Sequence, residues 1–300
     1  MSYAPIALFI YNRPEHTRRT LESLIRCAEF ADSPLYIFCD GPKSSTDQRK
    51  VQRARDVAFS LVGTRAKFIE SQTNKGLANS IISGVSQLCS TYGRAIALED
   101  DLVVAPVFLN FLNRALDKYQ DSEQVMHVSG YMFSIPEFLT RNEALFLPIT
   151  TSWGWGTWKR AWDCFDPQAS GWEVLKTDGD LQKRFNLDGA FDYSNMLKKQ
   201  MSGKIDSWAI RWHWSIFKSN GINLFPPQSY VQNIGLDGSG THGWRSARSV
   251  LNAGGTLQTL NQVSLPTRIG VIQEDFSLVK KPLTALRRLS WLKSLLRGFT

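Results

Sequence analysis

Arg94-Ala95-Ile96-Ala97-Leu98-Glu99-Asp100-Asp101 is the stretch that decides the fold of this 300-residue chain. Four apolar residues in a row, a length typical of a strand buried on both faces, are followed at once by three acidic residues. Like charges gathered at the end of a strand repel one another, so a cation is expected beside them. Oxygen ligands of this kind favour Mg²⁺ or Mn²⁺. The simpler alternative is that Asp101 caps the next helix and the other two carboxylates are solvated.

Three similar strands precede this one, and a helical pattern follows each of the four. The sequence predicts strands at 6–11, 35–39, 66–70 and 94–98, and helices at 16–30, 46–62, 77–89 and 107–119. Strands separated by helices of ten or more residues imply right-handed crossovers. We therefore expect the α/β class, with a mostly parallel sheet flanked by helices.

Polar groups follow the other predicted strands too. Tyr11-Asn12-Arg13 follows the first, Asp40 the second and Asn74-Lys75-Gly76 the third. Ligands bind at the carboxyl ends of parallel strands, so these groups should converge with Glu99–Asp101 on one cleft. Gly76 permits close backbone approach, and a helix start favours an anion such as a diphosphate. Each group alone has an ordinary alternative: a glycine turn, a turn aspartate or a solvated arginine.

The composition and the pattern of predicted elements change at about residue 125. Strands shorten, loops lengthen, and most of the ten tryptophans lie between Trp153 and Trp214. We expect a single domain over 1–262, with 1–125 as its first half and 126–262 as a second, aromatic-rich half packed against it. Residues 263–300 form a C-terminal extension in this division.

Composition and charge exclude several classes of protein. Hydrophobic residues make up 43% of the chain, which is enough for a sizeable core. The four cysteines form no C-x-x-C pair, which fits a reducing compartment. No apolar run approaches the ~20 residues of a spanning helix, and the N-terminus lacks a signal-peptide pattern, so a cytoplasmic protein is expected.

The positive charge is concentrated at one end of the chain. Residues 280–300 hold six of the 35 basic residues and none of the 27 acidic ones, so the remainder is close to neutral. A nucleic-acid binder would more usually carry a basic face on its folded body. No nucleic-acid partner is therefore expected.

Four segments together resemble nucleotide-sugar glycosyltransferases of the GT-A fold. They are Phe9–Pro14, Phe38–Gly41, Asn74–Gly76 and Leu98–Asp101, in the order seen in that family. The Glu-Asp-Asp form is similar to the N-acetylglucosaminyltransferase I group, where it replaces the commoner Asp-x-Asp. The likeness covers roughly residues 4–120 well.

The second half resembles this family more loosely, through three segments. Ser152–Trp155 is similar to a glycine- and tryptophan-containing segment on the acceptor side. Ile205–Trp208 is similar to an Asp-Asp-Trp stretch that carries the catalytic base, although Ser207 stands in place of one acid. Gly238–Gly243 is similar to a late Ser-His-Gly loop near the diphosphate.

The resemblance implies a GT-A-like fold, with a Rossmann-like nucleotide-binding half and a smaller acceptor-binding half. It implies metal-dependent, inverting transfer of a sugar from a nucleoside diphosphate donor, with UDP as the expected nucleotide. The acceptor would be a hydroxyl of a glycan or a lipid-linked glycan. The sugar would be a hexose or an N-acetylhexosamine.

The resemblance also implies roles for individual residues. Asp101 and His242 would hold the Mn²⁺ or Mg²⁺, and Asp206 would be the base. Trp153 and Trp155, flanked by glycines, would face the acceptor. The donor-binding set would be Tyr11, Asn12, Arg13, Asp40, Asn74, Lys75, Gly76, Glu99 and Asp100. Asp192 and Asp237 are the other candidates for the base, and an exposed histidine in a surface loop is the alternative for His242.

Two other function classes remain open at this point. A nucleotidyltransferase that makes a nucleotide sugar shares a strand-end nucleotide cleft and acidic metal ligands. It would normally carry a glycine-rich phosphate loop after the first strand, where this chain reads Tyr11-Asn12-Arg13-Pro14-Glu15. A non-catalytic carbohydrate-binding protein would account for the tryptophans but not for Glu99–Asp101.

The C-terminal extension carries a helical pattern of its own. Its apolar residues recur every three or four positions, at Leu283, Leu286, Leu289, Leu292, Leu296 and Phe299. A basic amphipathic helix of this kind can lie on an anionic membrane. We expect peripheral association through 280–300 with the inner face of the plasma membrane. The alternative is a terminal helix docked on the protein's own core.

Overall fold

The computed structural model describes residues 3–237, 257 and 261–297 and confirms the α/β class. Four parallel strands form the first half of the sheet in the order β3-β2-β1-β4. They are β1 (Ile6–Ile10), β2 (Leu35–Cys39), β3 (Ala66–Glu70) and β4 (Arg94–Glu99). The predicted ranges 35–39 and 66–70 are confirmed to the residue. The first is a short apolar run, and the second holds Phe68 and Ile69 between Lys67 and Glu70.

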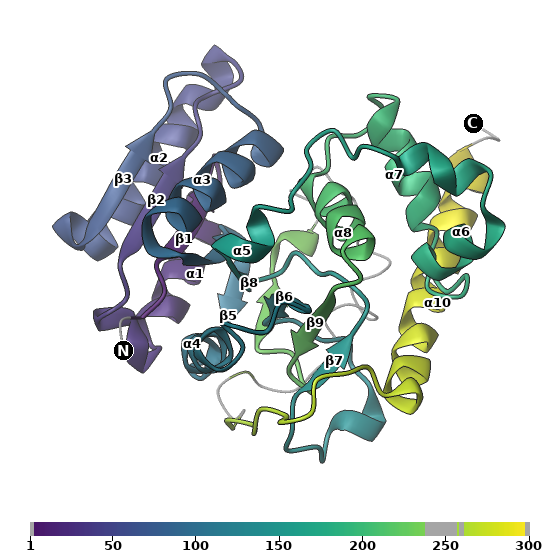
Figure 1. Ribbon diagram of the computed structural model, residues 1–300. Coiled ribbons are helices and arrows are strands. Elements are labelled where there is room, and N and C mark those ends of the chain that lie inside the picture. Colours follow the sequence, from purple (N-terminus) through teal and green to yellow (C-terminus); the bar gives the residue numbers. More distant parts are fainter. Residues whose placement is uncertain (1–2, 238–256, 258–260, 298–300) are drawn as a thin grey trace.

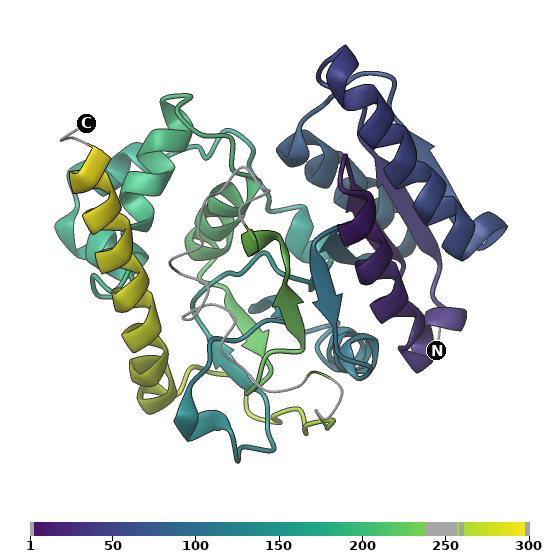
Figure 2. The ribbon, with the colours of Figure 1, turned by 180° about the vertical axis from the view of Figure 1, so that it is seen from behind.

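Four helices alternate with these strands along the chain, and the first three connect them and cover both faces of the sheet. They are α1 (Pro14–Ile25), α2 (Ser45–Val62), α3 (Leu77–Tyr92) and α4 (Phe108–Lys118). Helices α1 and α2 pack side by side on one face, and α3 lies on the other (Figures 1 and 2). The predicted helix at 16–30 begins two residues earlier and ends at Ile25, and a short 3₁₀ turn, η1 (Ala28–Ala31), follows it. Pro14 explains the start, since a proline suits the first turn of a helix.

The second half continues the same sheet with mixed strand directions. It adds β8 (Trp155–Trp158), β6 (Val125–Ser129), β9 (Ile222–Phe225) and β7 (Leu145–Leu147), in that order after β4. Strand β8 runs antiparallel to β4 and β6, whereas β6 and β9 are parallel. Because β8 is reversed, its first residues lie at the edge of the sheet where β4 ends. The expectation of a mostly parallel sheet holds best for β1 to β4.

A separate two-stranded ribbon was not predicted. Strand β5 (Leu102–Val104) follows the acidic stretch directly and pairs antiparallel with β10 (Val231–Asn233). Its residues are too few to show a periodic pattern, and the partner is more than 120 residues further along the chain. The ribbon brings the segment that follows β10, including η5 (Gly235–Asp237), against the acidic stretch.

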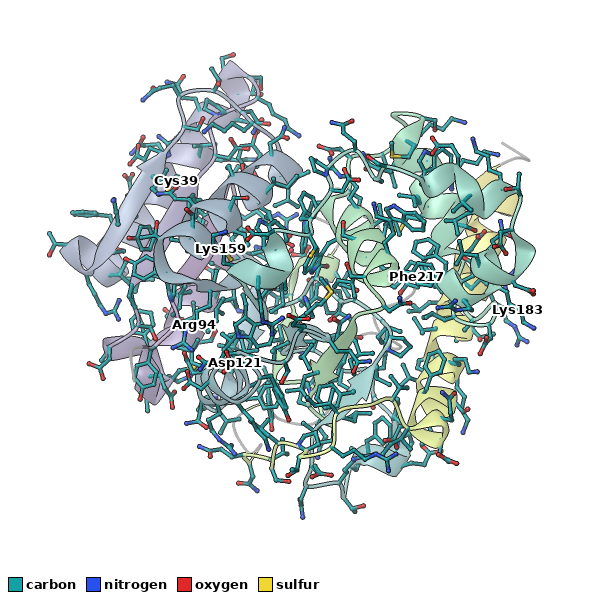
Figure 3. All side chains as sticks on the ribbon, in the orientation of Figure 1. Cys39, Arg94, Asp121, Lys159, Lys183 and Phe217 are labelled. Carbon is teal, nitrogen blue, oxygen red and sulfur yellow. The ribbon has the colours of Figure 1, made fainter. Side chains whose placement is uncertain are left out.

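Short helices enclose the aromatic core of the second half. They are α5 (Lys159–Trp162), α6 (Gly179–Phe185), α7 (Tyr193–Met201) and α8 (Trp208–Lys218), with the 3₁₀ turns η3 (Pro136–Phe138) and η4 (Trp172–Lys176). A further 3₁₀ turn, η2 (Gly63–Arg65), lies between α2 and β3 in the first half. Figure 3 shows Phe217 and Lys183 in this part of the molecule. The Phe217 ring packs edge-on against Phe185 at the end of α6, with centroids 5.1 Å apart.

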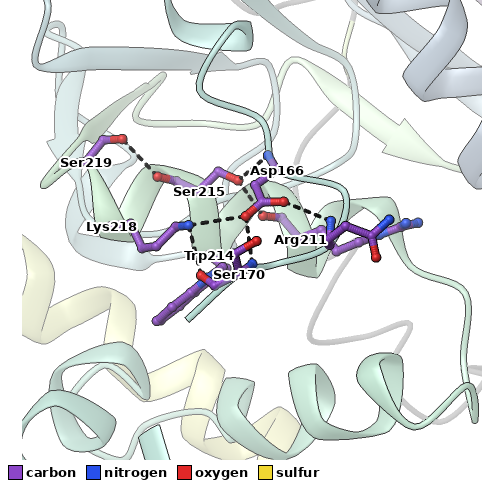
Figure 4. Close-up of polar contacts among 8 residues, drawn as sticks. Asp166, Ser170, Arg211, Trp214, Ser215, Lys218 and Ser219 are labelled. Atoms are coloured by element: carbon purple, nitrogen blue, oxygen red, sulfur yellow. Dashed lines mark hydrogen bonds and ion pairs between the residues drawn. The ribbon is translucent and has the colours of Figure 1, made fainter. Parts of the chain in front are cut away.

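Polar contacts fix the loop before η4 against α8 (Figure 4). Asp166 accepts hydrogen bonds from the backbone amides of Gln168 and Ser170, and Lys218 of α8 donates to it across 3.3 Å. These bonds stabilise the charged form and lower the pKa of Asp166, although burial acts against them. This carboxylate therefore has a structural role.

The C-terminal helix, α10 (Gln273–Arg297), packs along the second half of the molecule, where Figure 2 shows it from behind. Phe276, Val279, Leu283 and Leu286 are buried in one cluster with the side chains of β7 and the 131–149 segment. The docked alternative is therefore confirmed as far as Leu286. The side chains beyond Leu289, including Leu292, Leu296 and Phe299, lie outside the described residues.

The docked helix also uses part of its positive charge internally. Lys280 pairs with Asp188 at 3.0 Å and Lys281 with Glu137 at 3.2 Å, and Arg287 donates to the carbonyl of Gly189. The apolar stripe and several charges thus already have partners in the protein. The argument that this stripe faces a membrane is wrong for Leu283 and Leu286. Within the described residues, no helix is long and apolar enough to span a bilayer.

Candidate functional site

The ends of β1, β2 and β4 meet along one edge of the sheet. Ile10 pairs with Cys39, and Phe9 pairs with Glu99, so the residues that follow these strands are neighbours. The predicted convergence of Tyr11, Asp40 and the Glu99–Asp101 stretch is therefore confirmed. The hydrogen bonds, ion pairs and exposure of these side chains differ from one residue to the next.

The acidic stretch leaves β4 in a tight turn with its carboxylates unequally partnered. Asp100 Oδ2 accepts a hydrogen bond from the backbone amide of Tyr11 at 3.1 Å. Asp101 Oδ2 accepts from Arg13 Nη1 at 2.9 Å, which is also an ion pair. Glu99 is partly exposed, and its side chain makes no hydrogen bond or ion pair to any other described residue.

Burial and mutual repulsion make these acids difficult to ionise. Desolvation and then the neighbouring Asp101 raise the pKa of Asp100 to about 7. The same two causes, with Asp100 added, raise the pKa of Glu99 well above its usual value. Burial also raises the pKa of Asp101, but Arg13 acts in the opposite direction. A cation beside the stretch would favour the charged forms of all three.

The segment after β10 lies directly on Asp101. A Cβ atom placed on Gly235 would lie 2.1 Å from Asp101 Oδ2 and 2.9 Å from Arg13 Nη1, so a larger residue here would displace these side chains. The backbone amide of Ile234 donates to the Asp101 carbonyl at 2.8 Å. His16 Nε2 faces Asp237 Oδ2 at 3.4 Å on the same side. Gly235 was missed by the sequence analysis, because only the β5–β10 pairing reveals its neighbour.

One atom of the acidic stretch fits a metal ion. Asp101 Oδ1 is buried and has no hydrogen-bond partner among the described residues. A buried carboxylate oxygen without a partner is costly, and a divalent cation would satisfy it. No group of three acidic, histidine or cysteine side chains is arranged around a common point in the part of the chain that the structure describes. His242 lies outside those residues.

Asp40 holds a loop rather than facing open space. Its Oδ1 accepts from the backbone amides of Gly41 and Lys75, at 2.9 and 2.8 Å. Its Oδ2 accepts from the Asn74 side chain at 3.0 Å and from the Gly76 amide at 3.1 Å. Both oxygens are therefore occupied, and the expectation that Asp40 contacts the nucleotide directly is replaced by a structural role. The carboxylate fixes the turn that begins α3.

This loop exposes groups suited to an anion. Gly76 is the N-cap of α3 with φ of +78°, a conformation that glycine adopts at little cost. Lys75 is exposed beside it. Asp40 joins the helix start and this lysine to the end of β2, and β1 lies between β2 and β4 in the sheet.

Asp47 belongs to the site and was not among the predicted residues. It lies in the first turn of α2 and accepts from Tyr11 Oη at 2.9 Å and from Asn12 Nδ2 at 3.2 Å. The only sequence signal was its place near a predicted helix start. Through Asp47, the two residues that follow β1 are fixed to α2.

The two predicted acceptor tryptophans lie in different environments. Trp153 is partly exposed and packs edge-on against Tyr131, with ring centroids 4.6 Å apart. Trp155 is 1% exposed and stacks between His127 and Trp208, so it cannot contact a sugar. The prediction is wrong for Trp155, because the glycines beside it belong to a buried strand. Trp155 pairs instead with Ala97 of β4.

Asp206 precedes α8 and is largely exposed. Arg211 donates to its Oδ1 at 3.0 Å, and 61% of the Asp206 side chain is accessible. Trp208, two residues further on, stacks on Trp155. Trp155 in turn pairs with Ala97 of β4, so the segment that carries Asp206 is anchored to the sheet beside β4.

Of the other two candidates for the base, Asp192 accepts from the Asn195 amide as the N-cap of α7. Asp237 lies beside His16 near Asp101. The first therefore has a structural role, and the second belongs to the proposed metal side of the site.

Comparison with known proteins gives a distant likeness of fold. No protein-family model matches the chain, and no curated protein matches it. Among solved structures, mouse xyloside xylosyltransferase 1 matches at 14% identity, covering 87% of this chain and 96% of its own, with a TM-score of 0.35. The galactosyltransferase LgtC, solved with donor and acceptor sugar analogues, matches at 9% identity over 70% of each chain, with a TM-score of 0.33.

A third matched structure belongs to another class of enzyme. It is 4-diphosphocytidyl-2C-methyl-D-erythritol synthase from Anaerococcus prevotii, at 11% identity, covering 74% of this chain and 86% of its own, with a TM-score of 0.33. Likenesses at this level assign no activity.

Proposed function

We propose that this protein is a metal-dependent glycosyltransferase. It transfers a hexose or N-acetylhexosamine from a nucleoside diphosphate donor, expected to be a UDP-sugar, to a hydroxyl of a glycan or lipid-linked glycan. The observation that carries this proposal is the acidic stretch after β4. Three carboxylates lie at the ligand-binding edge of the sheet, and one buried oxygen, Asp101 Oδ1, has no described partner.

The residues around that oxygen divide into a metal side and a donor side. Asp101 would hold Mn²⁺ or Mg²⁺, and Glu99 and Asp100 would bind its water shell or donor hydroxyls. When bound, the metal neutralises charge that develops on the departing diphosphate. The start of α3 and the exposed Lys75 offer the donor the positive end of a helix dipole and a positively charged side chain. Tyr11 and Asn12, fixed by Asp47, would lie beside the nucleoside.

Asp206 is our choice for the base that removes the proton from the acceptor hydroxyl. Its side chain is accessible, as a base that meets an incoming acceptor requires. A base on the face of the sugar opposite the diphosphate gives an in-line displacement with inversion. Trp153, the accessible member of the predicted pair, would pack against the acceptor.

Replacing the two acids should separate their roles. Asp206→Asn should leave UDP binding nearly unchanged and lower kcat by ~10²–10⁴-fold, since a base acts in the transition state. Asp101→Ala should abolish metal-dependent transfer while the protein stays folded, because Asp101 lies in a turn after β4 and not in the core. Loss of UDP binding in Asp206→Asn, or near-normal turnover of Asp101→Ala at limiting Mn²⁺, would contradict these assignments.

The second candidate function is nucleotidyl transfer, which would use the same strand-end acids. Product analysis separates the two. A glycosyltransferase releases UDP from a UDP-sugar when an acceptor or water takes the sugar. A nucleotidyltransferase instead releases pyrophosphate from a nucleoside triphosphate and a sugar phosphate. Pyrophosphate release without UDP release from any of a panel of nucleotide sugars would overturn the proposal.

The proposed place of action is the cytoplasm, where nucleotide sugars and lipid-linked acceptors meet. Membrane contact would have to come from the basic end of the chain, since Leu283 and Leu286 are buried in the protein. Co-sedimentation with anionic and neutral vesicles at two salt concentrations tests this membrane contact. Binding that does not depend on anionic lipid, or no binding at all, would contradict membrane contact through the basic residues.

A further inference from the structure

We infer that Arg13 takes the place of the metal ion at Asp101 and gives up that place when metal and donor bind. This inference rests on the proposed function and concerns how the same site is controlled. The observation is the ion pair between Arg13 Nη1 and Asp101 Oδ2, 2.9 Å long. Among the described residues, Arg13 is the one basic side chain that pairs with the Glu99–Asp101 stretch.

Arg13 supplies a positive charge next to three neighbouring carboxylates. The three acids follow one another at the end of β4, and the Arg13 guanidinium lies against the last of them. The Arg13 side chain is 21% exposed and the Asp101 side chain 15%, so water screens this pair only partly. A positive charge in this position offsets part of the negative charge of the stretch.

The same position opposes a divalent cation. A metal at Asp101 Oδ1 would lie on the carboxylate group that Arg13 already contacts through Oδ2. Gly235 closes the other side, since it leaves no room even for a Cβ atom beside Oδ2 and Arg13. A metal on this carboxylate and the Arg13 guanidinium would be two like charges close together.

A nucleoside diphosphate resolves this conflict. Arg13 follows β1 at the ligand-binding edge, and a guanidinium binds phosphate oxygens as readily as carboxylates. If Arg13 turns from Asp101 to the diphosphate, the metal gains Asp101 and the donor gains a cation. The metal alone should therefore bind weakly and the metal with the nucleotide tightly.

The test measures Mn²⁺ binding without any turnover. Free Mn²⁺ is followed by its paramagnetic resonance signal in titrations of the whole protein, first without nucleotide and then with UDP. The variants are Arg13→Gln, Asp101→Asn and the matched control Arg18→Gln. Arg18 lies on α1, the helix that Arg13 precedes, and is exposed; it pairs with Glu15 and Glu22 away from the site. The control removes one positive charge without touching Asp101.

Arg13→Gln should bind Mn²⁺ alone at least about tenfold more tightly than the wild type, because a like charge next to the metal has been removed. In the presence of Mn²⁺ it should bind UDP about tenfold or more weakly, since a charge-assisted hydrogen bond to phosphate is lost. Arg18→Gln should match the wild type in both titrations. Asp101→Asn should lose Mn²⁺ binding.

Two results would overturn the inference, and they are distinguishable from each other. If Arg13→Gln binds Mn²⁺ alone no more tightly than Arg18→Gln, Arg13 does not compete with the metal, although the proposed metal site survives. If neither the wild type nor Arg13→Gln binds Mn²⁺ differently from Asp101→Asn, the metal site itself is wrong and the inference fails with it. Thermal unfolding of each variant confirms that the comparison is made between folded proteins.

Discussion

At the residue scale, the site is built from side chains that hold other parts of the site in place. Asp40 binds four donors around the start of α3, and Asp47 binds the two residues that follow β1. Neither leaves a carboxylate oxygen free of these bonds. Sequence reasoning selected Asp40 because it follows a strand, and this placed it correctly. Its partners depend on how the 71–76 loop returns to β2, which no local pattern specifies.

Asp40→Ala should therefore loosen the loop that carries Lys75 and Gly76. The four donors that Asp40 satisfies would lose a charged acceptor, which costs ~1–3 kcal/mol or more in the free energy of unfolding. We expect weaker UDP binding as well, because the start of α3 would no longer be fixed. Urea unfolding and UDP titration measure the two effects.

Asp56→Ala is the control for this change, since Asp56 is exposed on α2. It should be close to neutral in both measurements. A fully stable Asp40→Ala protein that binds UDP normally would show that the loop is held by other contacts.

The tryptophans show the limit of residue-level prediction. Glycines flank both Trp153 and Trp155, and the same sequence argument therefore covered both. Only Trp153 is accessible, because β8 begins at Trp155 and turns that ring into the core between His127 and Trp208. Strand assignment in a tryptophan- and glycine-rich stretch depends on the neighbouring strands β4 and β6, which the local sequence does not contain.

At the element scale, the ribbon of β5 and β10 brings η5, which follows β10, against the Glu99–Asp101 stretch. The strand–helix pattern of residues 1–125 could be predicted, since each strand is an apolar run and each helix has its own periodicity. A three-residue strand that pairs across more than 120 residues could not. As a result, Gly235 was missed although it touches Asp101 and Arg13.

Gly235→Ala should disturb the acidic stretch without a large loss of stability. The new Cβ would meet the Asp101 carboxylate and displace it from its position, so both Mn²⁺ affinity and transfer should fall, by about tenfold or more if Asp101 is a ligand. Gly270→Ala is the matched control, because nothing lies within 4 Å of a Cβ placed there. Equal Mn²⁺ binding by the two variants would show that η5 does not shape the site.

Helix α10 confirms the helical pattern of the C-terminal extension, but its apolar side chains as far as Leu286 pack in the protein core and not on a membrane. The apolar spacing predicts a stripe, but a stripe suits a protein core as well as a membrane. Leu283→Ala and Leu286→Ala should each lower the free energy of unfolding by about 2–5 kcal/mol, as is usual for a buried leucine. Lys281→Ala, at an exposed position, should change it little. Urea unfolding with losses below ~0.5 kcal/mol in the leucine variants would contradict the docked position.

At the scale of the whole molecule, the second half is held by an aromatic core with buried polar groups. His127 is 0% exposed, and its Nδ1 accepts from Trp212 Nε1 at 3.3 Å. Burial lowers the pKa of His127 to about 3 and that of His213 to about 4. Both imidazoles are therefore neutral in the folded protein at ordinary pH.

These histidines should make the protein sensitive to acid. Below a pH of ~6.5 the unfolded chain binds a proton at each histidine and the folded protein does not, so stability falls as the pH falls. Relative to His127→Gln, the wild type should lose up to ~1.4 kcal/mol of unfolding free energy per pH unit below that point. The loss should end near the folded pKa of about 3. Urea unfolding between pH 8 and 4.5 measures this difference, and a constant difference across the range would contradict it.

The account as a whole depends on one claim, that the acids after β4 bind a divalent cation together with a nucleoside diphosphate. The most direct measurement is thermal unfolding of the wild type and Asp101→Asn with UDP, in Mn²⁺ and in EDTA. At 100 times its Kd a ligand adds ~2.7 kcal/mol of stability, which gives a clear rise in Tm. The account predicts that rise only for the wild type with both Mn²⁺ and UDP. An equal rise in EDTA or in Asp101→Asn, or no rise with any nucleoside diphosphate, would contradict it.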